Sequence, residues 1–230
     1  MDFNGFQKLT LLDYPEKVAC TLFLAGCNFR CPFCHNAFLV TDIDNSITFS
    51  EEEILSYLKK RKGILEGVCI TGGEPLLRPD LEEFIKKVKE IGLCVKLDTN
   101  GTDPERLLSL IDSGLLDYVA MDIKSSPENY GRVAGVSDLD ILPIQKSVEI
   151  LKRGKIPYEF RTTIVKELHT LEDMEKIGAW IKGAERYFLQ NFVDSGNLIQ
   201  SNLHEHDKEA LEKMLKIVRK FVPNAEIRGI

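Results

Sequence analysis

Short apolar runs of strand length alternate along this chain with longer segments that have the spacing of amphipathic helices. Several of the short runs are apolar at nearly every position, as is typical of parallel strands covered on both faces. We expect strands at residues 18–24, 67–71, 93–98, 118–123, 158–165 and 187–192. Residues 1–15 are expected to form a short lead-in strand or flap before the first of them.

The segments between these strands carry recognisable helix ends. Ser50 and Glu53 form a capping box, in which each side chain bonds the backbone N–H of the other residue, and they predict a helix to about residue 62. Pro79 is expected to begin the next helix and Gly92 to end it. Further helices are expected at 103–114, 139–153, 171–182 and 207–221.

Six strand–helix units with short connections predict a parallel sheet. Crossovers between parallel strands are right-handed, so they curl the sheet in the same direction at every step. Six units are fewer than the eight of a closed barrel. We therefore expect an α/β fold, a partial, open (β/α)6 barrel with parallel strands. Because no linker or repeat divides the chain, we expect one domain over residues 1–230.

Polar residues gather where the expected strands end, which is where parallel α/β sheets bind ligands. A cysteine loop (residues 26–36) follows the first strand, a Gly-Gly-Glu turn the second and an Asp-Thr-Asn-Gly segment the third. An Asp-Ile-Lys segment closes the fourth strand, and an arginine lies inside the fifth. The residues of this rim are Cys27, Cys31, Cys34, Gly72, Gly73, Glu74, Asp98, Thr99, Asn100, Asp122, Lys124 and Arg161.

Three of the six cysteines, Cys27, Cys31 and Cys34, have the spacing C-x3-C-x2-C on this loop. Three thiolates can hold three irons of a four-iron cluster and leave the fourth iron free for a ligand. A structural zinc site instead needs four ligands, and His35 is poorly placed to bind the same ion as its neighbour. The spacing therefore favours an iron–sulfur cluster over zinc. The other cysteines lie in apolar strand candidates and are expected to be core thiols: Cys20, Cys69 and Cys94.

The charged rim residues suit a zwitterionic ligand that carries a ribose. Glu74 can accept hydrogen bonds from an ammonium group, while Lys124 and Arg161 can bind a carboxylate. Asp98 and Asp122 have two interpretations, because each can cap the next helix or take a hydroxyl or a cation.

Composition and charge exclude other classes. A net charge of −6 and the lack of an aromatic-interleaved basic patch argue against nucleic-acid binding. The apolar runs are too short to span a membrane, and the N-terminus lacks the features of a signal peptide, so we expect a cytoplasmic protein. In that compartment clustered cysteines are more often metal ligands than disulfides. The histidines outside the rim are assigned no function: His169 is expected to be a free, solvated loop residue before a helix, and His204 and His206 are expected to lie in a polar loop.

The cysteine loop resembles that of the radical S-adenosylmethionine enzymes, with Phe33 as the aromatic residue of their C-x3-C-x-aromatic-C signature. Residues 8–36 are similar to the activating enzymes of glycyl-radical proteins, above all in the residues that flank the outer cysteines. Within that family the segment 12–17 most resembles the anaerobic ribonucleoside-triphosphate reductase activating proteins. The Asp-Gly-Pro-Gly segment of pyruvate formate-lyase activators is absent, as is a ferredoxin-like cysteine insert.

The resemblance implies a [4Fe–4S] cluster on the three loop cysteines, with S-adenosylmethionine bound to its open iron. Positions that match a monovalent-cation site of pyruvate formate-lyase activators are Asp98, Thr99 and Asp122. The residues implied to contact S-adenosylmethionine are Phe33, Gly72, Gly73, Glu74, Asp98, Asn100, Lys124 and Arg161. Residues 190–192 stand where those relatives carry a histidine.

The resemblance also implies a function. The enzyme would cleave S-adenosylmethionine reductively to a 5′-deoxyadenosyl radical, which takes an α-hydrogen from a glycine of anaerobic ribonucleoside-triphosphate reductase. The implied partners are this glycyl-radical protein and a flavodoxin- or ferredoxin-like electron donor. The alternatives are activation of another glycyl-radical enzyme, of the pyruvate formate-lyase type, and a small-molecule substrate such as a deazapurine precursor. A further alternative, from another class, is a metal-binding or electron-transfer module without catalysis.

Overall fold

The computed structural model describes residues 1–43, 48–194 and 196–229. In this part of the chain the strands are β1 (Asp2–Phe3), β2 (Gly5–Thr10), β3 (Ala19–Leu24), β4 (Phe49–Ser50), β5 (Gly67–Gly72), β6 (Cys94–Thr99), β7 (Tyr118–Asp122), β8 (Tyr158–Ile164), β9 (Tyr187–Asn191) and β10 (Ala225–Arg228). The α-helices are α1 (Glu51–Lys60), α2 (Leu81–Ile91), α3 (Pro104–Asp112), α4 (Tyr130–Ala134), α5 (Leu142–Lys152), α6 (Leu171–Trp180) and α7 (Lys208–Val218), and two 3-10 turns are η1 (Ala37–Leu39) and η2 (Pro75–Leu77).

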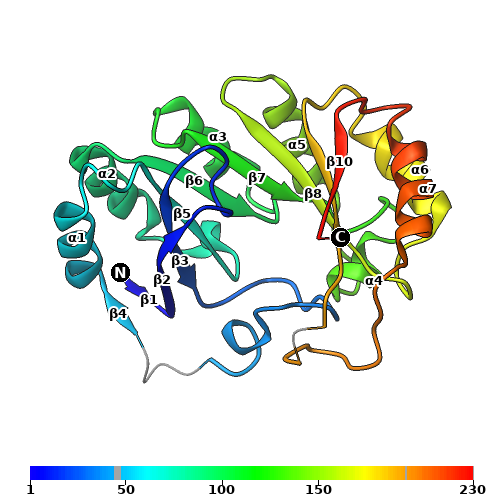
Figure 1. Cartoon of the computed structure of the whole chain (residues 1–230), viewed down its shortest axis with the longest axis horizontal. Helices are drawn as coiled ribbons and strands as arrows, with labels where there is room; N and C mark the ends of the chain where they lie inside the picture. The colour runs from blue at the N-terminus through cyan, green and yellow to red at the C-terminus, as the bar shows by residue number, and fades with distance from the viewer. Residues whose placement is uncertain (44–47, 195, 230) are drawn as a thin grey trace.

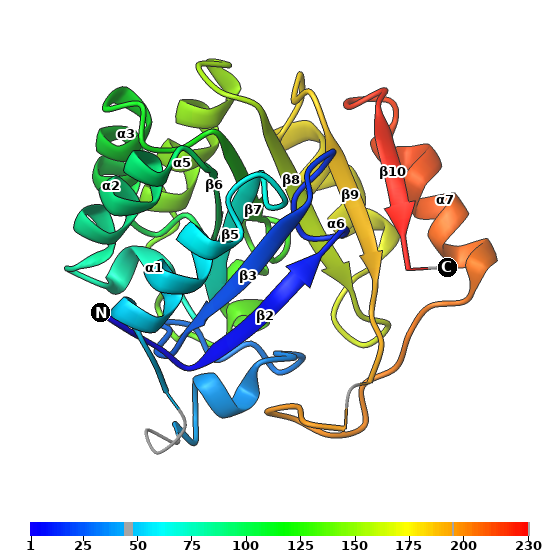
Figure 2. The same ribbon diagram turned by 60° about the vertical axis from the view of Figure 1, so that its left-hand side comes forward.

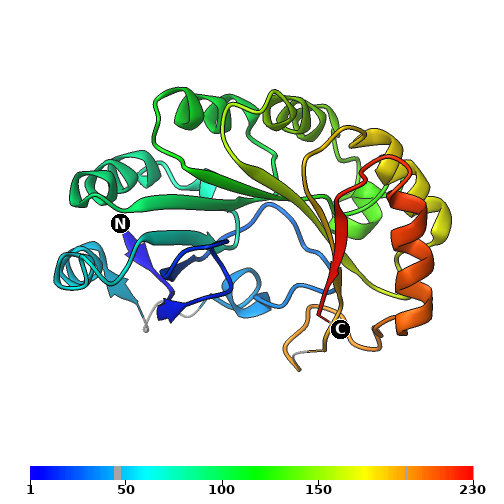
Figure 3. The same cartoon turned by 45° about the horizontal axis from the view of Figure 1, so that its top comes forward.

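A curved eight-stranded sheet organises the molecule, in the order β10-β9-β8-β7-β6-β5-β3-β2. All its neighbouring strands are parallel except β2, which pairs antiparallel with β3 (Figure 2). Helices cover the outer side of the curve, whereas loops of the first and last parts of the chain lie on its inner, open side (Figure 1, Figure 3). The expected open α/β barrel is confirmed.

The barrel has seven parallel strands instead of the expected six, because β10 extends it beyond β9. This strand is short and alternates apolar with charged residues, so it lacks the continuous apolar run by which the others were identified. Arg228 of β10 binds the buried carboxylate of Glu159 on β8 through two hydrogen bonds of 2.9 and 3.0 Å. A second unexpected element is the short helix α4, which follows β7.

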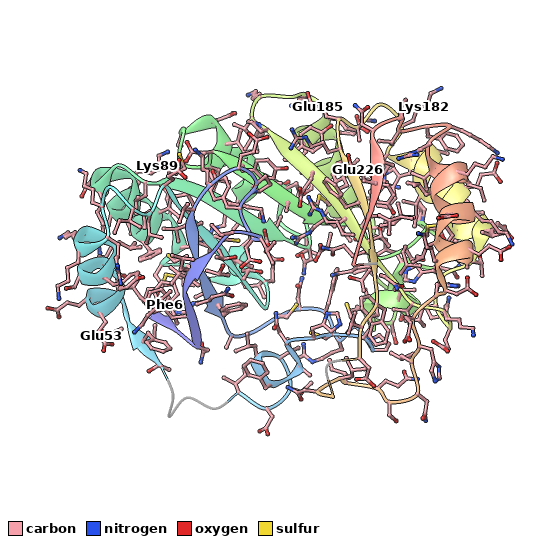
Figure 4. The ribbon with its side chains drawn as sticks, viewed as in Figure 1. Phe6, Glu53, Lys89, Lys182, Glu185 and Glu226 are labelled. Carbon is pink, nitrogen blue, oxygen red and sulfur yellow. The ribbon has the colours of Figure 1, made fainter. Side chains whose placement is uncertain are left out.

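The lead-in residues form β1 and the edge strand β2. β1 pairs with β4 in a small separate sheet. Phe6 of β2, labelled in Figure 4, packs edge-on against Tyr57 of α1, with 5.0 Å between the ring centroids. The capping box that begins α1 is present, since Glu53 N donates to Ser50 Oγ and Ser50 N donates to a carboxylate oxygen of Glu53. The described part of the chain contains no helix with the length and hydrophobicity of a membrane span.

The two faces of the sheet differ in character because successive side chains point to opposite sides of a strand. Fully buried apolar side chains such as Leu97, Val119 and Phe160 form the core between the sheet and the helices. The alternate residues of the same strands, among them Lys96 and Asp98 of β6, lie on the inner face. The barrel interior is therefore polar.

The turn after β5 lies directly against the cysteine loop. Gly73 N donates to Leu24 O at 2.7 Å, and Glu74 N donates to Gly26 O at 2.8 Å. A Cβ atom at Gly73 would overlap the carbonyl of Gly26, and Gly72 has a φ of +117° that favours glycine. The two glycines therefore allow two backbone segments to pack together.

His169 is buried, and the expectation that it is a free loop residue is wrong. The segment after β8 folds back so that His169 Nε2 donates to Lys124 O at 2.8 Å. Its Nδ1 accepts from Val165 N at 3.1 Å, which defines a neutral ring with the proton on Nε2. The ring thereby fixes the backbone just beyond the end of β7.

The burial of His169 predicts a pH-dependent stability, because burial lowers the pKa of this imidazole below its usual 6.5. The unfolded chain then takes up a proton more readily than the folded one, so the free energy of unfolding decreases as pH falls below about 6.5. His169→Gln keeps a donor for Lys124 O but does not titrate. In urea unfolding at pH 7.5 and pH 5, the wild type should lose more stability than this variant. Equal losses of stability in the two proteins would contradict the assignment of a buried, neutral imidazole to His169.

The close approach at Gly73 predicts that Gly73→Ala forces the turn and the cysteine loop apart. Overpacking of this kind reduces the free energy of unfolding by roughly 1–3 kcal/mol. Chemical denaturation of the variant and the wild type, prepared in the same way, measures the difference. An unchanged unfolding midpoint would show that the two backbones have room to separate.

Candidate functional site

A cavity of about 220 Å³ opens at the carboxyl ends of the parallel strands. It brings together nearly all of the rim residues that the sequence pattern predicts, although they come from five separate segments. The predicted residues that line it are Cys27, Cys31, Phe33, Cys34, Gly72, Gly73, Asp98, Thr99, Asn100, Asp122, Lys124 and Arg161. Glu74 is the predicted residue that lies outside this lining.

The cysteine loop is held by backbone groups that are distant in sequence. Arg30 N donates to Ala134 O, at the end of α4, at 2.9 Å. The Arg30 side chain turns back and donates to Cys27 O at 2.6 Å. On the other side of the loop, Gln200 N donates to Pro32 O at 2.9 Å. These bonds fix the shape of a segment that belongs to neither a helix nor a strand.

His35 joins this loop to the segment that follows β9. Its Nε2 donates to Val193 O at 2.8 Å, and its ring stacks on Phe192 with 5.7 Å between the centroids. No sequence pattern predicts this contact, because the two segments are about 160 residues apart and both are irregular. His35 therefore positions the loop beside the cavity.

The three loop cysteines are free, and their surroundings suit metal-bound thiolates. Burial raises the pKa of Cys27 and raises that of Cys31 to about 12, so both are protonated until a metal displaces the proton. Cys27 Sγ accepts from Phe29 N at 3.4 Å and from Asn100 Nδ2 at 3.9 Å. Such N–H donors stabilise the thiolates of iron–sulfur clusters.

In residues 1–43, 48–194 and 196–229, no three His, Cys, Asp or Glu side chains are arranged to hold a single metal ion. A cluster does not require such convergence, because each of its cysteine ligands binds a different iron. The donor set therefore fits a four-iron cluster with one iron open.

Asn100 belongs to a polar network beside Cys27. Its Nδ2 donates to Asn28 Oδ1 at 2.8 Å, and Asn28 Nδ2 donates to Thr102 Oγ1 at 2.8 Å. Thr102 N closes the network by donating to Asn100 Oδ1 at 3.0 Å. The amide of Asn100 is thus oriented by its neighbours, with its N–H groups toward the cysteine loop.

Glu74 has a different role from the expected one. Its carboxylate is almost completely buried and accepts from Leu76 N at 3.0 Å, Thr99 Oγ1 at 2.8 Å and Asn100 N at 2.6 Å. Burial raises its pKa to about 7, although these hydrogen bonds oppose the shift. Glu74 therefore connects the turn after β5 to the end of β6 instead of facing a ligand. The adjacent Pro75 was a sequence signal for this role, because proline in the first turn often follows a capping residue.

Five charged side chains cross the barrel interior in an alternating series, which we call the charge ladder. Lys96 Nζ pairs with Asp98 Oδ1, and Arg161 Nη1 pairs with Asp98 Oδ2 at 3.2 Å. Arg161 Nε pairs with Asp122 Oδ1 at 3.0 Å, and Lys124 Nζ pairs with Asp122 Oδ2 at 3.0 Å. Burial alone would raise the pKa of Asp122, but Arg161 and Lys124 outweigh it and hold the pKa at about 2. The ladder has three positive and two negative charges.

The residues of the expected monovalent-cation site do not fit a cation. Both carboxylates of Asp98 and Asp122 are already paired with basic side chains. Thr99 Oγ1 donates to Glu74 and accepts from Gly101 N at 3.1 Å, so its oxygen is engaged away from the two aspartates. The expectation of a cation site is therefore not supported. Lys96 was not identified from the sequence as a member of this site, because the residue lies within an apolar strand.

Phe33 lines the cavity with only 4% of its surface exposed. Lys124 Nζ is 6.0 Å from the centroid of its ring, and the His169 ring is at 6.3 Å. Further cavity-lining residues are Thr71, Thr163 and Gln190, the last of which belongs to the segment where the resembling family carries a histidine. The cavity thus combines an aromatic wall, three thiols and a surplus of positive charge.

Residues 21–181 match the Radical SAM superfamily. One relative is the protein MJ1227 of Methanocaldococcus jannaschii, whose name as a glycyl-radical enzyme activating enzyme is itself inferred. It is 34% identical to this chain over 233 residues, which make up 99% of this chain and 95% of that protein. A GTP 3′,8-cyclase of Helicobacter pylori is 34% identical over 158 residues, 65% of this chain and 47% of that enzyme.

The fold is shared with Streptococcus suis SuiB bound to S-adenosylmethionine, with a TM-score of 0.69 and 15% identity over 91% of this chain and 52% of SuiB. The chain therefore belongs to the Radical SAM superfamily, whose enzymes use a [4Fe–4S] cluster and S-adenosylmethionine, and within it to the family of glycyl-radical enzyme activating enzymes.

Proposed function

We propose that this protein activates an anaerobic ribonucleoside-triphosphate reductase by removing an α-hydrogen from one of its glycines. The observation that carries the proposal is a single cavity lined by three thiols, an aromatic ring and two basic side chains. The lead-in segment 12–17, which resembles that of the activators of this reductase, supports the choice of target. The name of the M. jannaschii relative supports a glycyl-radical protein as the substrate.

Each group in the cavity has a proposed task. Cys27, Cys31 and Cys34 bind the cluster, while Lys124 and Arg161 bind the carboxylate of S-adenosylmethionine by charge-assisted hydrogen bonds. When bound, the reduced cluster supplies the electron that cleaves S-adenosylmethionine to methionine and the 5′-deoxyadenosyl radical. The protein fixes the geometry and excludes competing hydrogen donors.

Other residues orient these groups. Phe33 offers a flat apolar face against which the adenine packs, and Gly72 and Gly73 form part of the cavity wall. Asn100 directs an amide N–H to Cys27 Sγ, which stabilises the thiolate. Glu74 holds Asn100 in place from behind.

The surroundings of the cavity suit a protein substrate. Phe38 follows the cysteine loop and has 47% of its surface exposed, and Val193, on the segment after β9, has 61% exposed. These two apolar side chains stand on the two segments that His35 joins. A loop of a large partner that enters the cavity would bury them.

An electron paramagnetic resonance experiment tests the target. The protein is reconstituted anaerobically with iron and sulfide, reduced with flavodoxin or dithionite, and mixed with S-adenosylmethionine and the reductase of the same organism. We expect a glycyl-radical doublet that requires both the activator and S-adenosylmethionine. Formation of 5′-deoxyadenosine without a doublet would exclude this reductase and direct the search to another glycyl-radical enzyme or to a small molecule.

Substitution of the loop cysteines tests the catalytic assignment. Cys31→Ala should abolish reductive cleavage of S-adenosylmethionine, because two thiolates cannot hold the cluster with a single open iron. Cys94→Ala is the matched control, since Cys94 lies at the opposite end of β6 from the cavity, and it should retain cleavage. Chromatographic measurement of 5′-deoxyadenosine and iron content reports both. Cleavage by the Cys31 variant would point to a non-catalytic role of the site.

A further inference from the structure

Lys96 has an unusual environment for a lysine. Only 1% of its side chain is exposed, and its Nζ contacts Asp98 and lies 3.7 Å from Cys69 Sγ. An unpaired charge at such a depth is strongly unfavourable, so a lysine here requires a compensating anion. Burial alone would lower the pKa of Lys96, but the attraction of Asp98 outweighs it and raises the pKa, so the ammonium is charged.

The position of Lys96 determines how much of the positive charge of Arg161 remains for a ligand. Asp98 and Asp122 both pair with Arg161, and each also has a lysine of its own, Lys96 or Lys124. Without Lys96, two aspartates would share two cations and the ladder would be neutral. With Lys96, the ladder has one positive charge more than its aspartates neutralise. The two basic residues that line the cavity, Arg161 and Lys124, present that surplus to a ligand.

We propose that the buried ammonium of Lys96 replaces a monovalent cation, so that S-adenosylmethionine binds to this enzyme independently of sodium or potassium. The proposal rests on the proposed function, in which the carboxylate of S-adenosylmethionine binds at Lys124 and Arg161. One surplus positive charge matches one ligand carboxylate. Lys96 does not contact the ligand and is a positioning residue that acts through Asp98 and Arg161.

The structure also indicates why a free ion has no place here. Lys96 and Arg161 engage both oxygens of Asp98, and Arg161 and Lys124 engage both oxygens of Asp122. A metal ion would have to displace one of these basic groups and leave it without its anion in the barrel interior. The ammonium of Lys96 avoids that loss, because it is part of the protein and reaches Asp98 without displacing another basic group.

Calorimetric titration of the wild-type holoenzyme with S-adenosylmethionine tests the proposal directly. The cluster is kept oxidised so that no cleavage occurs, and the buffer contains sodium, potassium or choline chloride at equal ionic strength. We expect dissociation constants that agree within about twofold, a difference of less than 0.5 kcal/mol. A tenfold weaker affinity in choline chloride than in either alkali salt would overturn the proposal.

The Lys96→Met variant tests the role of the ammonium itself. We expect its affinity for S-adenosylmethionine in choline chloride to fall about tenfold or more, since the surplus charge is lost, and to recover at least partly in sodium or potassium chloride. Lys89→Met, which removes the partner of Asp117 at the other end of the β6 region, should keep the wild-type affinity in all three salts. Unchanged affinity of the Lys96 variant in choline, or a loss that neither alkali ion restores, would overturn the proposal.

The two proposals fail in distinguishable ways. If the wild-type holoenzyme fails to bind S-adenosylmethionine in any of the salts, the proposed function is wrong. If binding occurs but requires an alkali ion, the role of Lys96 alone is wrong. The wild-type titration decides the second question even if the Lys96 variant does not fold.

Discussion

The neutralisation of charge inside a curled sheet is the constraint on which this structure depends. A barrel interior that binds a charged cofactor must contain charged groups, and each of them is unfavourable unless it is paired. The charge ladder satisfies this requirement across three neighbouring strands, β6, β7 and β8, whose register sets Asp122 beside Arg161. The same contacts hold the strands in register and leave a defined electrostatic surplus at the cavity. The charge ladder therefore contributes both to the stability of the fold and to the preference for a ligand carboxylate.

The fold and the site were predictable from the sequence to different degrees. The central strands were predictable because their apolar runs are nearly continuous, and α1 because Ser50 and Glu53 cap it locally. β10 was missed because an edge strand with one polar face has no such run. Which residues gather at the rim followed from topology alone, since parallel strands end on one side.

The orientation of individual side chains was not predictable, because it depends on partners far away in the sequence. Glu74 turns toward Thr99 and Asn100, and His169 inserts between segments that only the folded chain brings together. Lys96 was the most informative omission. In the sequence, this lysine only interrupts an apolar strand. Its role becomes clear once Asp98, two residues later, is seen to lie on the same face of the strand.

The anchoring of the cysteine loop has a consequence for biosynthesis. The loop occupies the first sixth of the chain, yet it is held by hydrogen bonds to backbone groups of Ala134, Val193 and Gln200, the one to Val193 coming from the His35 side chain. During translation these anchors emerge long after the cysteines, so the nascent loop lacks its final shape until the ribosome has completed most of the protein. The loop therefore reaches the shape in which it could hold a cluster only when the chain is nearly finished. Cells that supply iron and sulfide late, after release of the protein, would lose nothing by the delay.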